Sequence, residues 1–514
     1  MKAKKSLALI LALLMLGSQF AACSDSTENA DTTGETTADP NAAEATDTLA
    51  EETADPNARV DDGLEDGVTY DGYTFNIFQH TAVYKDFQAE EITGEPINDA
   101  DFERRTAVED KLDVVIKFHD LTAGQRDGQV PLGTVVQAGT NDYDIGSIMS
   151  YSACNALTQG LLTNLFSVPN LDLEREWWDQ YCTEECTFVD KVYFMTGDIS
   201  IGDNRNTFCA YFNKNMAEEY QLPNFYEMVD NGTWTIENFQ KQAEAVTANL
   251  DFDNDGNHVN DADDIYGIWI WDDVMMGIVN AADIKCCTVN KQTGDIELTL
   301  MSEKFLDTFE KFAAYAFNKD VTCAYQRNGY AADYGSIAFR EGRGLFFLQN
   351  VGSSLNFREM EDEFGILPLP KYDEQQDRYI SSGASWGLPF YVIPRLTYDQ
   401  EGYARIGYIT QALAYESMYT MTPAFYDQTL QNKISRDEES ARMLDIIFES
   451  RSYDFGWYFE FGNYNETIMI MLRTYDTNFS SKYKTSSKVA EKKIKKANEA
   501  IKAMELNNEE AAAE

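Results

Sequence analysis

Three short apolar runs between residues 341 and 394 constrain the fold of this chain more than any other stretch. They cover residues 344–348, 364–369 and 387–393, and Gly or Pro marks their ends. Each run has the length of a β-strand, and the first and third are apolar enough to be buried on both faces, as in a parallel sheet covered by helices. Amide, hydroxyl and indole groups follow these strands, which suits a site for a polar small molecule. The loops carry Gln349, Asn350, Ser353, Ser385 and Trp386.

The first part of the globular region alternates between strand and helix patterns. Residues 73–78, 114–118 and 143–148 read as strands, with helical spacing at 99–112 and 132–138 between them. This order predicts parallel strands joined by right-handed crossovers. Because ligands of such sheets bind beyond the carboxyl ends of the strands, Tyr151 is a candidate contact.

Several motifs in a fixed order resemble one protein family. They are the GRGLFF strand at 342–347, FGILPLPK at 364–371 and YVIP at 391–394, preceded by DYDI at 142–145, YFNK at 211–214 and WTIENF at 234–239. Together they resemble the extracellular solute-binding proteins of ABC importers, in the sugar-binding branch, over residues 70 to 480. The resemblance implies an α/β, two-lobe periplasmic-binding-protein type II-like fold with a hinge and discontinuous lobes.

The resemblance also implies the domain organisation of the globular part. It places residues 67–195 and about 384–420 in an N-terminal lobe, and residues 196–383 and about 421–514 in a C-terminal lobe. In the family the lobes close over the ligand by a hinge motion, and the closed form docks on a permease.

The amino terminus has the features of an export signal. Lys2, Lys4 and Lys5 precede a short apolar run, and Ala21-Ala22 precede Cys23. The pattern predicts a signal peptide at residues 1–22 and a lipidated Cys23, the alternative being cleavage after Ala22 with Cys23 left free. Residues 23–66 then form an acidic segment, poor in large apolar residues, that reads as a disordered tether. The expected location is the extracellular face of the cell membrane.

The net charge of −46 excludes several partners. Nucleic acid needs a basic face, so a nucleic-acid partner is not expected. The same charge argues against adhesion to anionic lipid and favours solubility of an exported chain. Of the eight Cys, seven remain after Cys23, and their spacing does not indicate a disulfide framework or a zinc site.

An acidic segment at residues 251–264 resembles the start of an EF-hand or dockerin-type calcium loop. Asp251, Asp253 and Asp255 alternate and Gly256 stands sixth, as the loop requires. The twelfth position is Ala262, so the predicted set of oxygen ligands, Asp251, Asp253, Asp255, Asn257 and Asp263, has to close through a longer loop. A structural Ca2+ ion is the expectation, and a solvated acidic turn is the alternative.

One hydrolase-like motif occurs, at residues 383–387, where Ser385 stands in G-x-S-x-G. The nucleophile elbow needs a helix after the Ser and a His later in the chain. Here a strand pattern follows, and all three His precede Ser385. We therefore expect no catalytic residues. An extracellular glycan-active hydrolase with a carboxylate pair remains the alternative, because such a pair is defined in space rather than in sequence.

Aromatic and short polar side chains are what a sugar site needs, since sugar rings stack on aromatic faces and hydroxyls form hydrogen bonds. The predicted function is a substrate-binding lipoprotein that captures a mono- or oligosaccharide and delivers it to the membrane subunits of an ABC permease. The predicted ligand contacts are Tyr151, Asp198, Arg205, Trp271, Asn350, Trp386 and Trp457.

Overall fold

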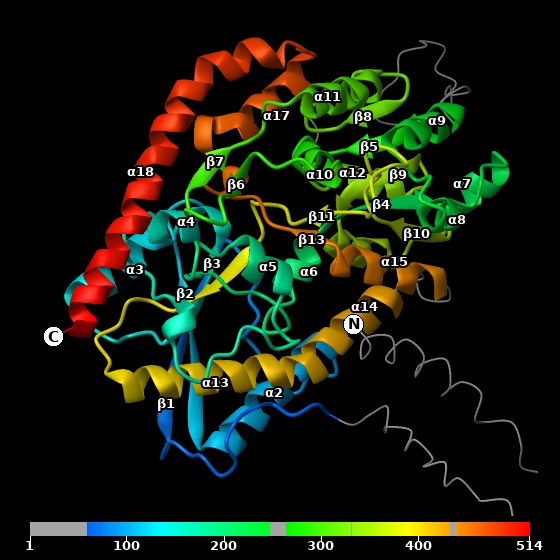
Figure 1. Cartoon of the computed structure of the whole chain (residues 1–514). Helices are drawn as coiled ribbons and strands as arrows, with labels where there is room; N and C mark the ends of the chain where they lie inside the picture. Colours follow the sequence, from blue (N-terminus) through cyan, green and yellow to red (C-terminus); the bar gives the residue numbers. More distant parts are fainter. Residues whose placement is uncertain (1–58, 247–263, 330, 432–437, 514) are drawn as a thin grey trace, which may run out of the picture. The chain divides into compact units, whose positions relative to one another are not determined.

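A computed structural model describes residues 59–246, 264–329, 331–431 and 438–513 of the chain (Figure 1). The chain divides into two units, Met1–Gly63 and Leu64–Glu514. The second unit contains all the sheets described below. Within the described residues, no helix combines the length and the apolar character needed to cross a membrane.

The first sheet has four strands in the order β12-β3-β1-β2. Strands β1 and β2 are parallel, as are β1 and β3, so the parallel pairing predicted for this region is confirmed. Residue 146 in β3 is a Gly because a Cβ atom there would come within 2.3 Å of the ring of Phe78 on the neighbouring strand β1. The strands are β1 (Tyr73–His80), β2 (Val114–Leu121), β3 (Ile145–Met149) and β12 (Pro389–Val392).

The second sheet has five strands in the order β10-β4-β9-β5-β8. Strand β5 runs parallel to β8 and β9, whereas β4 is antiparallel to β9 and β10. The strands are β4 (Phe208–Asn213), β5 (Tyr266–Ile270), β8 (Thr322–Ala324), β9 (Gly344–Asn350) and β10 (Phe364–Leu367).

The sheets correct one prediction from the apolar runs. The runs at 344–348 and 387–393 were expected to belong to parallel strands. Strand β9 is parallel on one side only, and β12 is antiparallel to β3. Complete burial of β12 and of residues 344–348 explains the apolar sequences, because burial on both faces does not depend on strand direction.

The helices and the short strands complete the fold (Figure 1). Two pairs of short strands stand apart from the main sheets, β6 (Cys287–Val289) with β7 (Ile296–Leu298), and β11 (Ser381–Ser382) with β13 (Arg451–Ser452). The helices are α2 (Pro96–Leu112), α3 (Gln129–Ala138), α4 (Ser150–Thr158), α5 (Gln180–Glu185), α6 (Gly202–Asn206), α7 (Lys214–Glu219), α8 (Phe225–Asp230), α9 (Ile236–Val246), α10 (Val274–Ala281), α11 (Glu303–Ala316), α12 (Tyr334–Arg340), α13 (Gln400–Tyr419), α14 (Met421–Gln431), α15 (Glu438–Glu449), α16 (Phe455–Tyr458), α17 (Tyr464–Thr474) and α18 (Phe479–Ala513), with 3-10 helices η1 (Leu165–Ser167), η3 (Val351–Phe357) and η5 (Phe461–Asn463).

The sequences of several helices explain where they begin. The hydroxyl of Ser302 accepts a hydrogen bond of 3.1 Å from the backbone of Phe305 at the start of α11. Thr235 accepts one of 3.3 Å from the backbone of Asn238 before α9. Apolar side chains then repeat along one face of each helix, and α9 packs on β5 and β9 through that face.

The strands of the two sheets come from the chain segments predicted for the two lobes. The first sheet uses residues 73–149 and 389–392, and the second uses residues 208–367. Helices α13 and α14 both pack against α2, which contacts β2. Because α14 begins at Met421, the chain still contacts the helices of the first sheet beyond the predicted boundary near residue 420.

All seven Cys of the globular part are buried and free of disulfide bonds. The expectation that they do not form a disulfide framework is therefore confirmed. Burial raises the pKa of Cys154 and Cys182 well above the ordinary thiol value, so these groups are poor nucleophiles.

A buried arginine joins α2 to three other segments of the chain. The guanidinium of Arg104 on α2 donates to the carboxylate of Asp101 at 3.0 Å and to the backbone carbonyl of Ile199 at 2.9 Å. It also donates to the hydroxyl of Ser417 on α13 at 2.9 Å and to the backbone carbonyl of Asp86. The side chain is fully buried. Arg104 therefore balances the charge of the Asp101 carboxylate and donates hydrogen bonds to three further acceptors in the interior.

Replacing Arg104 by Met is expected to lower the free energy of unfolding by about 3–5 kcal/mol, because Asp101 would remain as a buried carboxylate without its partner. The matched control is Arg175→Met. Arg175 also pairs with a carboxylate three residues away, Asp172, but its side chain is 36% exposed. The control should cost less than about 1 kcal/mol. Urea unfolding at equal protein concentration measures both, and equal losses would contradict the interpretation of Arg104.

Candidate functional site

An aromatic cluster lies where the first sheet ends. Strand β3 ends at Met149, and Tyr151 is the second residue of the helix that follows. Tyr151 and Met149 pack with Val83, which follows β1, and the partly buried Ala82 and Trp386 pack against them. We call these five residues the Tyr151 cluster. Because β12 is antiparallel to β3, residues 385–388 precede β12 at the same edge where β3 ends.

Hydroxyl groups fix the Tyr151 cluster. The phenol of Tyr151 and the hydroxyl of Ser385 share a hydrogen bond of 2.8 Å. The hydroxyl of Ser150 donates to the backbone carbonyl of Ser385 at 2.7 Å. The indole N–H of Trp386 has no hydrogen-bond partner among the described residues. That N–H is buried as well as unpartnered, which is unusual for an indole donor.

A second group of side chains lies at the carboxyl ends of the parallel strands β5, β8 and β9. Trp271 follows β5, Tyr325 follows β8, and their rings are 5.0 Å apart between centroids. The amide of Gln349, near the end of β9, donates to the phenol of Tyr325 at 3.3 Å. Asn350 ends β9, and its side-chain oxygen accepts a hydrogen bond of 3.0 Å from Ser353. We call Trp271, Asp273, Tyr325 and Gln349 the Trp271 group.

The carboxylate of Asp273 gives the Trp271 group its charge. Burial, together with the neighbouring charge of Asp272, raises the pKa of Asp273 to about 7. A hydrogen bond with Trp271 and the charge of Arg473 act in the opposite direction. Asp272 itself is buried and forms an ion pair with Arg473. Asp273 is thus the carboxylate of this pair whose charge changes near neutral pH.

An electrostatic interaction links the Trp271 group to Tyr151. Burial raises the pKa of the Tyr151 phenol to about 12, and the negative charges of Glu460 and Asp273 contribute to the rise. The guanidinium of Arg126 lies 4.5 Å from the centre of the Tyr151 ring and donates to Glu460 at 2.8 and 2.5 Å. Since Asp273 follows the second sheet and Tyr151 follows the first, side chains from the ends of both sheets act on one phenol.

Of the predicted contacts, Tyr151 and Trp386 lie in the same cluster, and Trp271 belongs to the group that acts on it. Asn350 lies at the end of the neighbouring strand β9. Arg205 lies elsewhere, with its guanidinium 4.6 Å from the ring centre of Tyr84, and lines a cavity of ≈ 160 Å³ with Tyr84, Asp86 and Met421.

The other two predicted contacts are engaged by the protein itself. Asp198 accepts a hydrogen bond of 2.7 Å from the hydroxyl of Thr422. Trp457 is only 3% exposed, and its indole N–H donates to the side chain of Asn280 at 3.1 Å. This geometry favours a packing role for Trp457, because an indole that contacts a ligand needs an open face. We do not include Trp457 in the candidate site.

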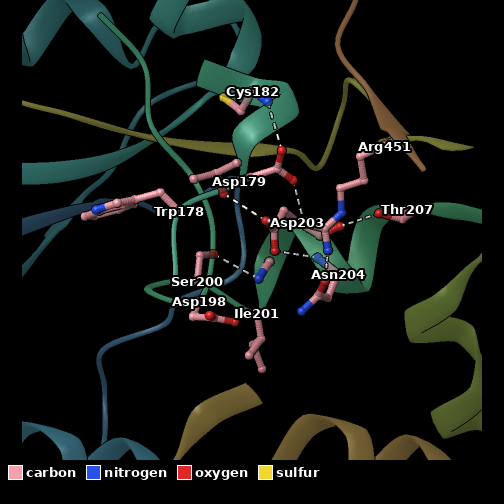
Figure 2. A network of polar contacts seen from close by, with 12 residues as sticks. Trp178, Asp179, Cys182, Asp198, Ser200, Ile201, Asp203, Asn204, Thr207 and Arg451 are labelled. Carbon is pink, nitrogen blue, oxygen red and sulfur yellow. Dashed lines mark hydrogen bonds and ion pairs between the residues drawn. The ribbon is translucent and has the colours of Figure 1, made fainter. Parts of the chain in front are cut away.

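A buried polar network lies close to the segments that connect the two sheets (Figure 2). Arg451 on β13 donates to the carboxylates of Asp179 at 2.8 Å and Asp203 at 3.2 Å, and to the side chain of Asn204. Thr196 donates to Asp203 at 3.0 Å. Tyr453 donates to Asp179 at 3.0 Å. We call these six residues the Arg451 network.

The Arg451 network holds the connections between the sheets. Residues 196–207 lead into β4 of the second sheet, and the segment around Gly383, which forms an isolated bridge with Thr207, leads back to β12 of the first. Burial raises the pKa of Asp203 to about 7 in spite of the neighbouring Arg451 charge. Its carboxylate oxygens already accept hydrogen bonds within the protein. The network therefore has a structural role at the connections rather than a ligand-binding one.

The metal prediction lies outside this site. Residues 251, 253, 255, 257 and 263 are outside the described part of the chain. Among the residues that the structure does describe, no group of three or more His, Cys, Asp or Glu side chains is placed to hold a metal ion.

Sequence reasoning missed four residues of the site. Asp273 and Tyr325 follow strands β5 and β8, so the strand-end argument that selected Tyr151 could have found them. Arg126 and Glu460 come from loops more than 300 residues apart, and their ion pair has no local sequence signal.

No protein-family model matches this chain, and no curated protein matches it. Solved structures do match its fold. UgpB from Mycobacterium tuberculosis, in complex with glycerophosphocholine, matches with a TM-score of 0.52 and 16% sequence identity, covering 83% of this chain and 98% of UgpB.

Two further structures give similar values. The ABC substrate-binding protein Lmo0181 from Listeria monocytogenes, in complex with cycloalternan, has a TM-score of 0.51 and 11% identity over 82% of this chain and 99% of its own. An ABC transporter solute-binding protein from Thermotoga lettingae, bound to α-D-tagatose, has a TM-score of 0.50 and 15% identity over 83% and 100%. At such identities the likeness concerns the fold, which is the two-lobe α/β fold of these solute-binding proteins.

Proposed function

We propose that this protein is the substrate-binding component of an ABC importer and that it captures a carbohydrate. The observation that carries the proposal is that side chains at the ends of both sheets act on one residue, Tyr151: Ser385 through a hydrogen bond of 2.8 Å and Asp273 through its charge. A two-lobe binding protein needs such a convergence, because a ligand held between lobes must contact both.

The chemistry of the site supports a polar, largely uncharged ligand. Trp271 and Trp386, which are both half-buried, offer aromatic faces, and such faces stack on the C–H faces of sugar rings. Asp273 and Gln349 offer hydrogen bonds to hydroxyls. The charges of Glu460 and Asp273 near Tyr151 disfavour an anionic ligand. The ligands of the similar structures, an oligosaccharide, a ketose and a glycerol phosphodiester, share hydroxyl groups.

The lipid anchor on Cys23 and the calcium ion depend on residues outside the described part of the chain, and both are part of the proposal. Lipidation of Cys23 would hold the protein at the extracellular face of the membrane, with the acidic segment up to residue 66 as the tether between the anchor and the globular part. The mass of the protein extracted from membranes checks the lipid.

A Ca2+ ion on Asp251, Asp253, Asp255, Asn257 and Asp263 would stabilise the chain before β5, and equilibrium dialysis against Ca2+ tests its binding.

The glycan-hydrolase alternative draws on one observation, the raised pKa of Asp273, since a general acid requires a carboxyl that is protonated near neutral pH. The neighbouring Asp272 is held by Arg473, and Ser385 is followed by a strand rather than a helix. The similar structures are described as binding proteins. These observations favour recognition without bond cleavage.

Carbohydrate binding is expected to raise the melting temperature, and Trp386→Ala should weaken the affinity about tenfold by removing a stacking face. A thermal-shift screen with maltotetraose, cycloalternan, α-D-tagatose and glycerophosphocholine identifies the ligand, and calorimetry gives the affinity. Phe166→Ala is the control, because Phe166 is an aromatic side chain that is 46% exposed outside the site. Chromatography of the incubated sugar must return it intact; shortened products would establish the hydrolase instead.

The affinity for that carbohydrate is expected to increase as the pH rises through about 7. A hydroxyl that donates to Asp273 binds the ionised carboxylate better, so binding lowers the pKa of Asp273, and protonation at lower pH competes with the ligand. Asp273→Asn should remove this dependence between about pH 6 and 8 while leaving the fold intact. Calorimetry across that range measures it, and an unchanged pH profile in the variant would assign the dependence to another group.

A further inference from the structure

The carboxyl-terminal helix α18 is basic in an acidic protein. Between residues 479 and 504 it carries eight Lys and only two Glu, whereas the whole chain has a net charge of −46. All eight Lys side chains are exposed. The lysines are Lys482, Lys484, Lys488, Lys492, Lys493, Lys495, Lys496 and Lys502.

The opposite face of α18 docks on the protein. Buried side chains recur at spacings of three and four residues and pack α18 against η5, β7, α17 and α4 (Figure 1). They are Ala490, Ile494, Ala497, Ile501 and Met504. The basic side of the helix therefore faces outward for a structural reason and is held there by a fixed apolar contact.

Seven of the eight lysines of α18 fall into two sets, and Lys493 belongs to neither. Lys482, Lys495 and Lys502 form ion pairs with Asp476, Glu499 and Asp295 at 3.3, 3.8 and 2.6 Å. Lys495 and Lys502 also line a groove between α18 and β7 that contains the carboxylates of Asp295 and Glu297. These paired lysines are largely neutralised where they lie.

The second set forms a row. Lys484, Lys488, Lys492 and Lys496 are four residues apart and so follow one another along one side of the helix, at about 6 Å per step and about 18 Å in total. Within the described part of the chain, none of the four has a carboxylate at ion-pair distance. Val489, which is 55% exposed, lies beside them. We call these four lysines the lysine row.

We propose that the lysine row is a docking surface for an anionic lipid bilayer. A lysine close to an anionic membrane attracts it by electrostatics, and several in a row act together. The net charge of the chain does not prevent this, because at physiological salt charges beyond about 8 Å are largely screened. At α18 the proposal therefore departs from the expectation, drawn from composition, that the protein does not adhere to anionic lipid.

Other polyanions fit the row less well. Single-stranded nucleic acid is bound with aromatic side chains that stack on bases, and the row contains none. A flat bilayer suits a straight, outward-facing row with an exposed Val at its side, as in helices that lie on membrane surfaces. The proposed anchor at Cys23 would bring the surface and the row together, but the docking is a property of α18 and does not depend on the anchor or on the ligand.

The test uses the full chain with Cys23→Ser, so that no lipid anchor contributes, and sedimentation with vesicles. We expect stronger binding to phosphatidylcholine vesicles that contain phosphatidylglycerol than to pure phosphatidylcholine. The triple variant Lys488→Gln/Lys492→Gln/Lys496→Gln should bind the anionic vesicles at least about tenfold more weakly. Because all variants share one amino terminus, differences between them come from the lysines.

The matched control removes the same three charges from the paired set, as Lys482→Gln/Lys495→Gln/Lys502→Gln, and should lose less than about threefold. Lys488→Arg/Lys492→Arg/Lys496→Arg keeps the charge and should bind like the parent, which separates charge from folding. Equal binding by the row variant and the control, or no preference of the parent for anionic vesicles, would overturn the proposal. Tighter competition by soluble polyphosphate or poly-glutamate than by anionic vesicles would also overturn it. Carbohydrate binding should be unchanged in every variant, so failure here leaves the proposed receptor function standing.

Discussion

The ion pairs of Arg451 with Asp179 and Asp203 are the interaction on which the arrangement of the two sheets depends. The guanidinium lies in the interior and shares its donors among three side chains. All three belong to residues 179–204, which precede the second sheet, while Arg451 comes from beyond its last strand. A buried charge of this kind is stable only when every partner is present, so it fixes the path of distant segments at once.

The positions of the segments that connect the two sheets also determine where the side chains of the candidate site lie. Residues 384–388 run from the connecting segment near the Arg451 network to β12. This short connection places Ser385 and Trp386 beside Tyr151. In the second sheet, the parallel strands β5, β8 and β9 end at the same edge. Strand direction alone therefore brings Trp271, Tyr325 and Gln349 together. The site therefore follows from strand direction and from the connections, and its side chains come from segments that are far apart in the sequence.

This explains what the sequence could and could not predict. Strand runs and helix faces are local patterns, so β1, β9 and α18 are recognisable from a few residues each. The strand-end rule selected Tyr151, whereas Trp271, Trp386 and Trp457 were selected as aromatic side chains. The sequence could not separate Trp386 from Trp457, because Gly and polar residues flank both, and only the fold decides that Asn280 and the core enclose Trp457. The ion pair between Arg126 and Glu460 is likewise set by tertiary packing alone.

The net charge of the chain, like its strand and helix patterns, does not say where individual charged side chains lie in the fold. A single net value describes the field of the whole chain at a distance, yet at contact distance each surface acts through its own side chains. Near Tyr151 the carboxylates of Glu460 and Asp273 dominate, although Arg126 lies on the ring. On α18 the carboxylates of Asp295 and Asp476 neutralise one set of lysines and leave the other exposed. Selection on recognition acts on these local fields, and a strongly acidic protein can therefore carry a site that disfavours anions and a helix that attracts them.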